Sequence, residues 1–249
     1  MTHQAVPHET VNHETATRET AVPEAATREA AVPEAATREA ATREAVVHRA
    51  VSGPARPQRE IRAQYTDTTI TVYQAYAPFI GLPAARDGRF PDTWKRDRMT
   101  WIKPSFLWMM YRCGWAAKEG QETVLAVEIT REGFDWALAR SELSHYASGV
   151  HPDHAAWRDS LRRSPARVQW DPERDLRLAR LPYRSLQLGL SGEASRRYAD
   201  EWTVSIRDVT PLARRIHAHV SAGRLDEAAE LLPRETPYPG ATPWDDALG

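Results

Sequence analysis

The sequence lacks the features of a disulfide-stapled, secreted or membrane-spanning protein. Its 249 residues include a single cysteine, Cys113, which excludes an intramolecular disulfide and a cysteine-rich zinc site. No apolar run approaches the ~20 residues that a membrane-spanning helix requires. The first residues also lack the apolar stretch of a signal peptide. We therefore expect a cytoplasmic protein without a membrane partner.

The chain also lacks an excess of charge of either sign. Its 33 basic and 34 acidic residues give a formal net charge of −1, which argues against extensive binding to duplex nucleic acid. Lysine is rare, and the lysines are Lys95, Lys103 and Lys118. The densest histidine patch (His145, His151, Asp153 and His154) falls in a segment rich in Ser, Gly and Pro. Metal ligands are normally fixed on rigid elements, so we expect no metal site there.

Aromatic residues are absent from the N-terminal region, which we expect to be a disordered tail over residues 1–57. The decamer AVPEAATREA occurs twice in succession, over Ala21–Ala30 and Ala31–Ala40, with partial copies beside it. Such a segment has too little apolar surface to fold alone. We expect a second disordered tail over residues 238–249.

The remaining residues, 58–237, have the pattern of one α+β domain. Strand-like runs occur at residues 69–76, 100–103, 123–129, 167–170, 185–190 and 203–206. Helical patterns occur at residues 82–87, 105–113, 131–143, 191–202, 210–222 and 225–232. The predicted fold is a split, mainly antiparallel sheet flanked by helices, with a helical hairpin at the C-terminus.

The run RMTWIKPSFLWMMYR, from Arg98 to Arg112, points most directly to a binding site. It is apolar enough for a core, yet it contains cations, which are costly to bury without an anion, a carboxylate or an aromatic face. Pro104 divides it into a strand and a helix, and a helix N-terminus favours phosphate. We therefore predict a pocket for a phosphate-bearing ligand, lined by Tyr73, Gln74, Arg98, Lys103, Ser105 and Arg112.

Several motifs resemble a family that has no assigned function. REIRAQY, TVYQAY, MTWIKPSFLWMMYR, EITREGF, VQWDPERD and QLGLSGEA together look like the domain-of-unknown-function 4291 family. The resemblance runs from about Arg59 to Pro237, and by itself it implies no activity.

A second resemblance is to ADP-ribosyltransferase-like domains. Their first motif is similar to Val72–Tyr76 followed by Gly88-Arg-Phe90, and their second to the strand and helix at 101–111. The resemblance implies NAD as cofactor, with Tyr73, Arg98, Lys103 and Arg112 in the binding pocket. It also implies catalytic positions at Gln74, Ser105 and either Gln187 or Glu193. Gln74 departs from the usual histidine or arginine, and Gln187 is not acidic.

Two functions follow as expectations. The first is a nucleotide- or NAD-binding transferase that moves ADP-ribose to a nucleic acid or a small acceptor. The alternative is a non-catalytic module that binds nucleic acid or another partner, using Trp94, Lys95, Arg96 and Arg98 on a surface groove. Salt dependence separates them, because phosphate-backbone binding weakens steeply with ionic strength.

Overall fold

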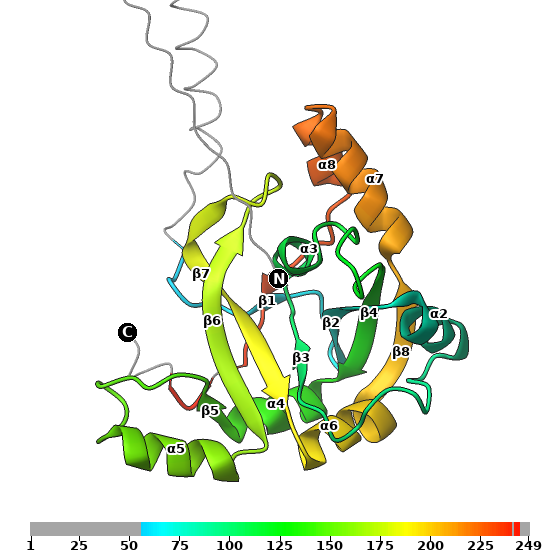
Figure 1. Ribbon diagram of the computed structural model, residues 1–249. Helices are drawn as coiled ribbons and strands as arrows, with labels where there is room; N and C mark the ends of the chain where they lie inside the picture. Colours follow the sequence, from blue (N-terminus) through cyan, green and yellow to red (C-terminus); the bar gives the residue numbers. More distant parts are fainter. Residues whose placement is uncertain (1–55, 241, 245–249) are drawn as a thin grey trace, which may run out of the picture. The chain divides into compact units, whose positions relative to one another are not determined.

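Two mainly antiparallel sheets form the centre of the described chain, which in this computed structural model comprises residues 56–240 and 242–244 (Figure 1). The three-stranded sheet has the order β2 (Thr69–Tyr76), β4 (Thr123–Thr130), β8 (Thr203–Asp208). The four-stranded sheet has the order β3 (Thr100–Ile102), β7 (Arg180–Leu190), β6 (Ala166–Arg174), β5 (Ser141–Leu143). A backbone bridge between Tyr73 and Lys103 joins β2 to β3. The predicted α+β class with a split sheet is therefore confirmed.

A short two-stranded pair links the two ends of the described chain. β1 (Arg62–Ala63) pairs antiparallel with β9 (Thr236–Pro237). The chain stays packed beyond Pro237, where the sequence analysis ended the domain. Tyr238 is buried, its N–H donates to the Ile61 carbonyl at 2.8 Å, and Trp244 packs against the core. Most of the predicted N-terminal tail, residues 1–55, lies outside the described residues.

Helices lie around both sheets (Figure 1). They are α2 (Pro78–Asp87), α3 (Phe106–Cys113), α4 (Arg131–Ala139), α5 (His154–Arg163), α6 (Glu193–Arg197) with the π-helical turn η1 (Tyr198–Trp202), α7 (Thr210–Ser221) and α8 (Leu225–Glu230). In the part of the chain that the structure describes, no helix has the length and apolar character needed to cross a bilayer.

Strands β2 and β4 of the three-stranded sheet are buried on both faces, which explains the unbroken apolar run of β4. Leu125, Val127 and Ile129 belong to the larger core cluster, whereas the alternating residues Val124 and Ala126 face a second cluster under α3 and α7. A strand covered on both sides has no need of polar alternation. The sheet is thus held between two cores, and β2 and β3 meet at its edge.

Local signals fix α3 beside that edge. Pro104 ends the strand, and the Ser105 hydroxyl then accepts a hydrogen bond from the Trp108 N–H at 3.2 Å, which caps the helix. The helix ends at Gly114, whose φ of 58° is left-handed, a conformation that glycine adopts without steric cost. The helix predicted over residues 105–113 is therefore present, and it begins one residue later than predicted, at Phe106.

Several predicted elements differ from the structure, and α2, β6 and β7 are longer than predicted. The helix predicted over residues 131–143 ends at Ala139, because residues 141–143 pair with β6 as a parallel strand. The segment around His154 was expected to be a loop, but it begins α5, capped by Asp153. Most residues of this helix are polar and none is buried, so the segment carries no run of core residues that would mark an element. The helix predicted over residues 191–202 starts at Glu193 and changes to a π-helical turn at Tyr198.

Candidate functional site: a cationic pocket between β2, β3 and α3

A pocket of about 520 Å³ opens where the two sheets meet. It is lined by Gln74, Ala75, Tyr76, Phe79, Ile80, Thr93, Trp94, Lys95, Arg98, Met99, Thr100, Trp101, Lys103, Met109, Arg112, Gly120 and Gln121. Four of these described residues are cations and none is an Asp or Glu. Lys95, Arg98 and Arg112 are exposed, whereas Lys103 is 7% exposed. The pocket therefore has a cationic mouth and a buried amine.

The Lys103 amine is buried, and its surroundings shift its pKa. Its Nζ donates to the Trp101 carbonyl at 2.8 Å and lies 5.8 Å from the centre of the Trp108 ring. Burial, with the nearby Arg112 guanidinium as the next cause, lowers the pKa of Lys103 to about 7. Near neutral pH the amine is therefore a mixture of its charged and neutral forms.

Gln74 holds the wall of the pocket together. Its side-chain amide nitrogen donates to the Thr100 hydroxyl at 2.6 Å and to the Trp101 carbonyl at 3.2 Å. Its amide oxygen accepts from the Tyr198 hydroxyl at 2.7 Å. The side chain is 4% exposed, so these bonds lock β2 onto β3 and fix the orientation of the amide. Gln74 lines the predicted pocket, but its oxygen and both of its N–H groups are already engaged by the protein.

Ser105 and Tyr73 do not line this pocket, although the sequence prediction placed them there. At the start of α3, where the sequence predicted a bound phosphate, a carboxylate of the protein itself occupies the helix terminus. Glu235 accepts the Phe106 N–H at 2.7 Å, which satisfies the helix terminus from within the chain. Tyr73 is buried and donates its hydroxyl to the Gln64 side-chain oxygen at 3.0 Å.

Two carboxyl groups gather beside the start of α3. Burial, opposed by the hydrogen bond from the Phe106 N–H and assisted by the neighbouring Glu173, raises the pKa of Glu235 to about 8. Burial also raises the pKa of Glu173, against the effect of hydrogen bonds from the Arg174 N–H and from Ser105 and Ser185. This acidic pair belongs to the N-terminus of α3 and is distinct from the cationic lining of the pocket.

Gln187 lies on β7 in a polar cluster with two residues of β6. Gln169 is its cross-strand partner, and Asp171 accepts hydrogen bonds from the side-chain amides of both glutamines. Asp171 is close enough to Lys103 to oppose the lowering of the lysine pKa. The sequence analysis gave no role to Asp171. The sequence VQWDPERD does contain a signal for this cluster, because its alternating polar residues give one face of β6 a polar character.

Glu193, the other candidate acid, lies away from the pocket lining. It occupies the first turn of α6, its side chain is 60% exposed, and it forms an ion pair with Arg197 at 3.6 Å. A carboxylate at this position is stabilised by the helix dipole.

Trp94 lines the pocket but is buried and stacked on Phe90, with ring centres 4.7 Å apart.

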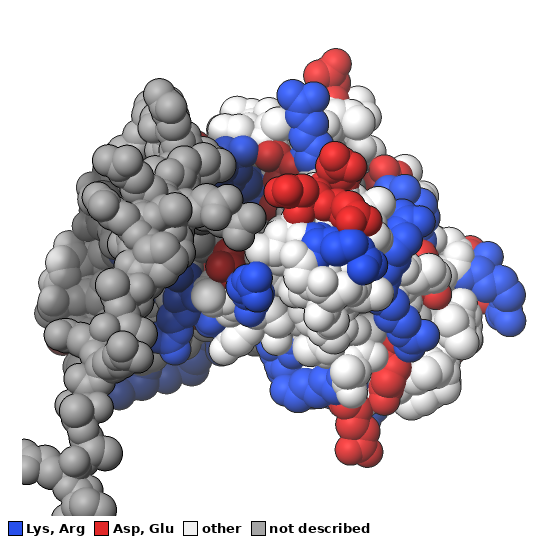
Figure 2. All heavy atoms as spheres, turned by 90° about the horizontal axis from the view of Figure 1, so that it is seen from above, with Lys and Arg blue, Asp and Glu red and all other residues white. Residues whose placement is uncertain are grey.

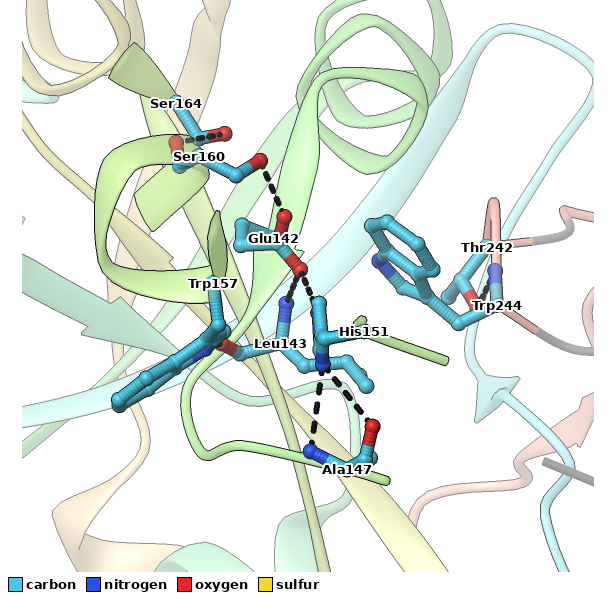
Figure 3. A network of polar contacts seen from close by, with 9 residues as sticks. All are labelled: Glu142, Leu143, Ala147, His151, Trp157, Ser160, Ser164, Thr242 and Trp244. Atoms are coloured by element: carbon cyan, nitrogen blue, oxygen red, sulfur yellow. Dashed lines mark hydrogen bonds and ion pairs between the residues drawn. The ribbon is translucent and has the colours of Figure 1, made fainter. Parts of the chain in front are cut away.

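The histidine patch forms a structural network around a buried carboxylate (Figure 3). Glu142 accepts from His151 Nε2 at 2.9 Å, from the Leu143 N–H at 2.7 Å and from the Ser160 hydroxyl. Asp153 caps α5 instead of facing a metal. No group of three potential metal-ligating side chains occurs in the described ranges. The contacts join β5, the following loop and α5.

Cys113, the single cysteine, is fully buried at the end of α3. Burial raises the pKa of its thiol, which keeps it protonated and unreactive at neutral pH.

The chain was compared with known proteins and protein families. No curated protein and no solved structure matches it. The family described as "Domain of unknown function (DUF4291)" matches residues 60–238, a range that includes both sheets and every residue that lines the pocket. The chain therefore belongs to the DUF4291 family.

Proposed function

We propose that this protein binds a nucleotide of the NAD class in the pocket between β2, β3 and α3. The observation that carries the proposal is the composition of the lining: Lys95, Arg98, Lys103 and Arg112, without an acidic residue among the described lining positions. Cations that converge on a cavity without a carboxylate to neutralise them attract a phosphate-bearing ligand.

Size and aromatic content support a nucleotide over a bare inorganic anion. The volume of about 520 Å³ lies in the range of small-molecule sites. Phe79 lines the pocket with 68% of its surface exposed, and Trp101 is partly exposed. Such rings offer faces on which a base stacks. Arg98 and Arg112 at the mouth are exposed, and a guanidinium group can bind a phosphate through two hydrogen bonds.

The finer proposal is that the bound NAD donates ADP-ribose to a nucleic acid or a small acceptor. Departure of nicotinamide leaves positive charge on the ribose, and a nearby carboxylate stabilises that charge. Asp171, hydrogen-bonded to Gln187 and close to Lys103, supports this role better than the exposed Glu193. Gln187 and Asp171 do not line the pocket, and the proposal assigns them together, beside Lys103, to the position that the resemblance gave to an acid. Release of nicotinamide from NAD by the wild-type protein, measured by chromatography, tests this step. No release above a protein-free blank would refute it.

Binding is tested by titration calorimetry with NAD, ADP-ribose and ATP. Substitution Arg112→Gln removes a charge-assisted contact to phosphate, and we expect affinity to fall by about tenfold or more. Arg214→Gln, which removes an exposed arginine on α7, is the matched control and should leave affinity unchanged. Absence of binding by the wild type at millimolar nucleotide, or equal effects of the two substitutions, would refute the proposal.

The alternative, a nucleic-acid-binding module, has a smaller basis in the structure. Trp94 is buried, and Arg96 is paired with Asp200 at 2.9 Å, which leaves Lys95 and Arg98 of the expected cluster. On the face seen in Figure 2, acidic and basic side chains are interspersed. Oligonucleotide affinity that falls steeply between low and physiological salt would favour this alternative, because pocket binding of a mononucleotide releases few counterions.

A further inference from the structure

Lys103 differs in its surroundings from the other two lysines of the chain. Lys95 and Lys118 are exposed, whereas Lys103 is 7% exposed and lines the pocket. The Trp101 carbonyl accepts one of its N–H groups at 2.8 Å. No ion pair joins its amine to a carboxylate of the described residues. The Trp108 ring, whose centre lies 5.8 Å from Nζ, gives the amine an aromatic neighbour, whereas a purely structural buried lysine usually pairs with an acid.

The groups around Lys103 favour a nucleophilic amine. Arg112 and Cys113 face it from α3, and Asp171 faces it from β6. Cys113 is buried with a raised thiol pKa and therefore contributes no negative charge at neutral pH. Burial and the second cation favour the neutral form of the amine, with a pKa of about 7. Desolvation next to another cation is a recognised way in which proteins activate a lysine for attack on carbonyl carbon.

We propose that Lys103 forms an imine with the carbonyl carbon of a phosphate-bearing reducing sugar held in the pocket. The inference rests on the proposed function, because the cationic mouth that would bind nucleotide phosphates is also what selects a sugar phosphate. The ligand class includes nucleotides whose ribose has a free anomeric carbon, since such a ribose opens to an aldehyde.

The chemistry needs no partner beyond the sugar. The Nζ lone pair attacks the aldehyde carbon and forms a C–N bond, while the C=O π electrons move to oxygen. That oxygen takes up a proton as the nitrogen loses one, which gives a carbinolamine. Loss of water from the carbinolamine then gives the imine. The hydrogen bond from Nζ to the Trp101 carbonyl uses an N–H, so in the neutral amine the lone pair stays available for the attack.

The experiment traps the imine on the intact chain. The protein is incubated with ribose 5-phosphate and cyanoborohydride at pH 7.5, and modified peptides are quantified by mass spectrometry. Lys95 and Lys118 are internal references with the same reagent and the same incubation. At this pH a lysine with an ordinary pKa is neutral in roughly one molecule in a thousand. We therefore expect Lys103 to be labelled at least about tenfold more than either reference.

Two further arms test the pocket. Ribose without phosphate should label Lys103 much less than ribose 5-phosphate, and the Arg112→Gln variant should lose this preference. Labelling of Lys103 should also increase between pH 6 and 8, as its amine loses its proton. Labelling at Lys103 that does not exceed the references, or no difference between the two sugars, overturns the inference.

Nucleotide binding measured on the same preparation separates the two proposals. If the nucleotide binds and Lys103 is not labelled, the proposed function stands and the imine is refuted. If Lys103 is labelled selectively and no nucleotide binds, the nucleophile stands and nucleotide binding is refuted.

Discussion

Replacing Lys103 by methionine is expected to make the domain more stable. Methionine has a similar length and no charge, so the variant removes the cost of burying an amine without an acidic partner. The pKa of the amine is about 7 in the folded protein and 10.5 without perturbation. That difference corresponds to roughly 5 kcal/mol of lost stability when the amine must be charged. The hydrogen bond to Trp101 and imperfect packing of methionine offset about 2 kcal/mol of the gain.

We therefore expect the Lys103→Met variant to be more stable by about 3 kcal/mol at pH 6.5. For a domain of this size the melting temperature would rise by roughly 6–12 °C. Chemical denaturation of both proteins, followed by tryptophan fluorescence, gives the difference in unfolding free energy. Lys95→Met, at an exposed lysine, is the control and should change the unfolding free energy by no more than about 0.5 kcal/mol.

The pH dependence of this difference is the sharper test. Below pH 7 the amine is protonated in both states, so the full penalty is present. Between pH 7 and 10.5 the unfolded chain binds more protons at Lys103 than the folded chain does, so wild-type stability rises with pH. The advantage of the methionine variant should therefore shrink by about 1.4 kcal/mol per pH unit above pH 7. A difference that stays constant from pH 7 to 9, or a variant less stable than wild type at pH 6.5, would refute the reasoning.

Two further predictions concern carboxylates outside the pocket. Glu142→Ala leaves His151 and Ser160 without their buried acceptor and should lower the unfolding free energy by about 3 kcal/mol. The control Glu201→Ala, at a surface ion pair, should lower the unfolding free energy by less than about 1 kcal/mol. Equal losses for the two variants in denaturant unfolding would contradict the role of Glu142. Glu235 binds more protons in the folded than in the unfolded state between pH 4.5 and 8, so it contributes a loss of stability as pH rises through this window. The Glu235→Gln variant keeps an oxygen that can accept the Phe106 N–H. Its melting temperature should fall less between pH 5 and 8 than that of the wild type. The same dependence of melting temperature on pH in both proteins would refute the raised pKa of Glu235.

The sequence by itself determined the elements whose signals are local. The strand Thr69–Tyr76 has the predicted bounds, because β-branched and aromatic residues make up most of this run. The helix after Pro104 was set by its proline, its Ser105 cap and the glycine that follows it. The cations of the core-like run, Arg98, Lys103 and Arg112, lie on the lining of one pocket, and their role in binding stays a prediction. A buried cation is costly wherever it lies, so its presence in an apolar run was informative without a structure.

Only the tertiary structure decided which partner each polar group meets. The start of α3 looked suited to phosphate, but Glu235, 129 residues further along the chain, occupies the Phe106 N–H. Asp171 reached the neighbourhood of Lys103 and Gln187 because β6 and β3 both flank β7. Residues 141–143 became a strand because β6 offered a free edge. Such contacts depend on which segments fold against one another, and that information is spread over the whole sequence instead of residing near the residues concerned.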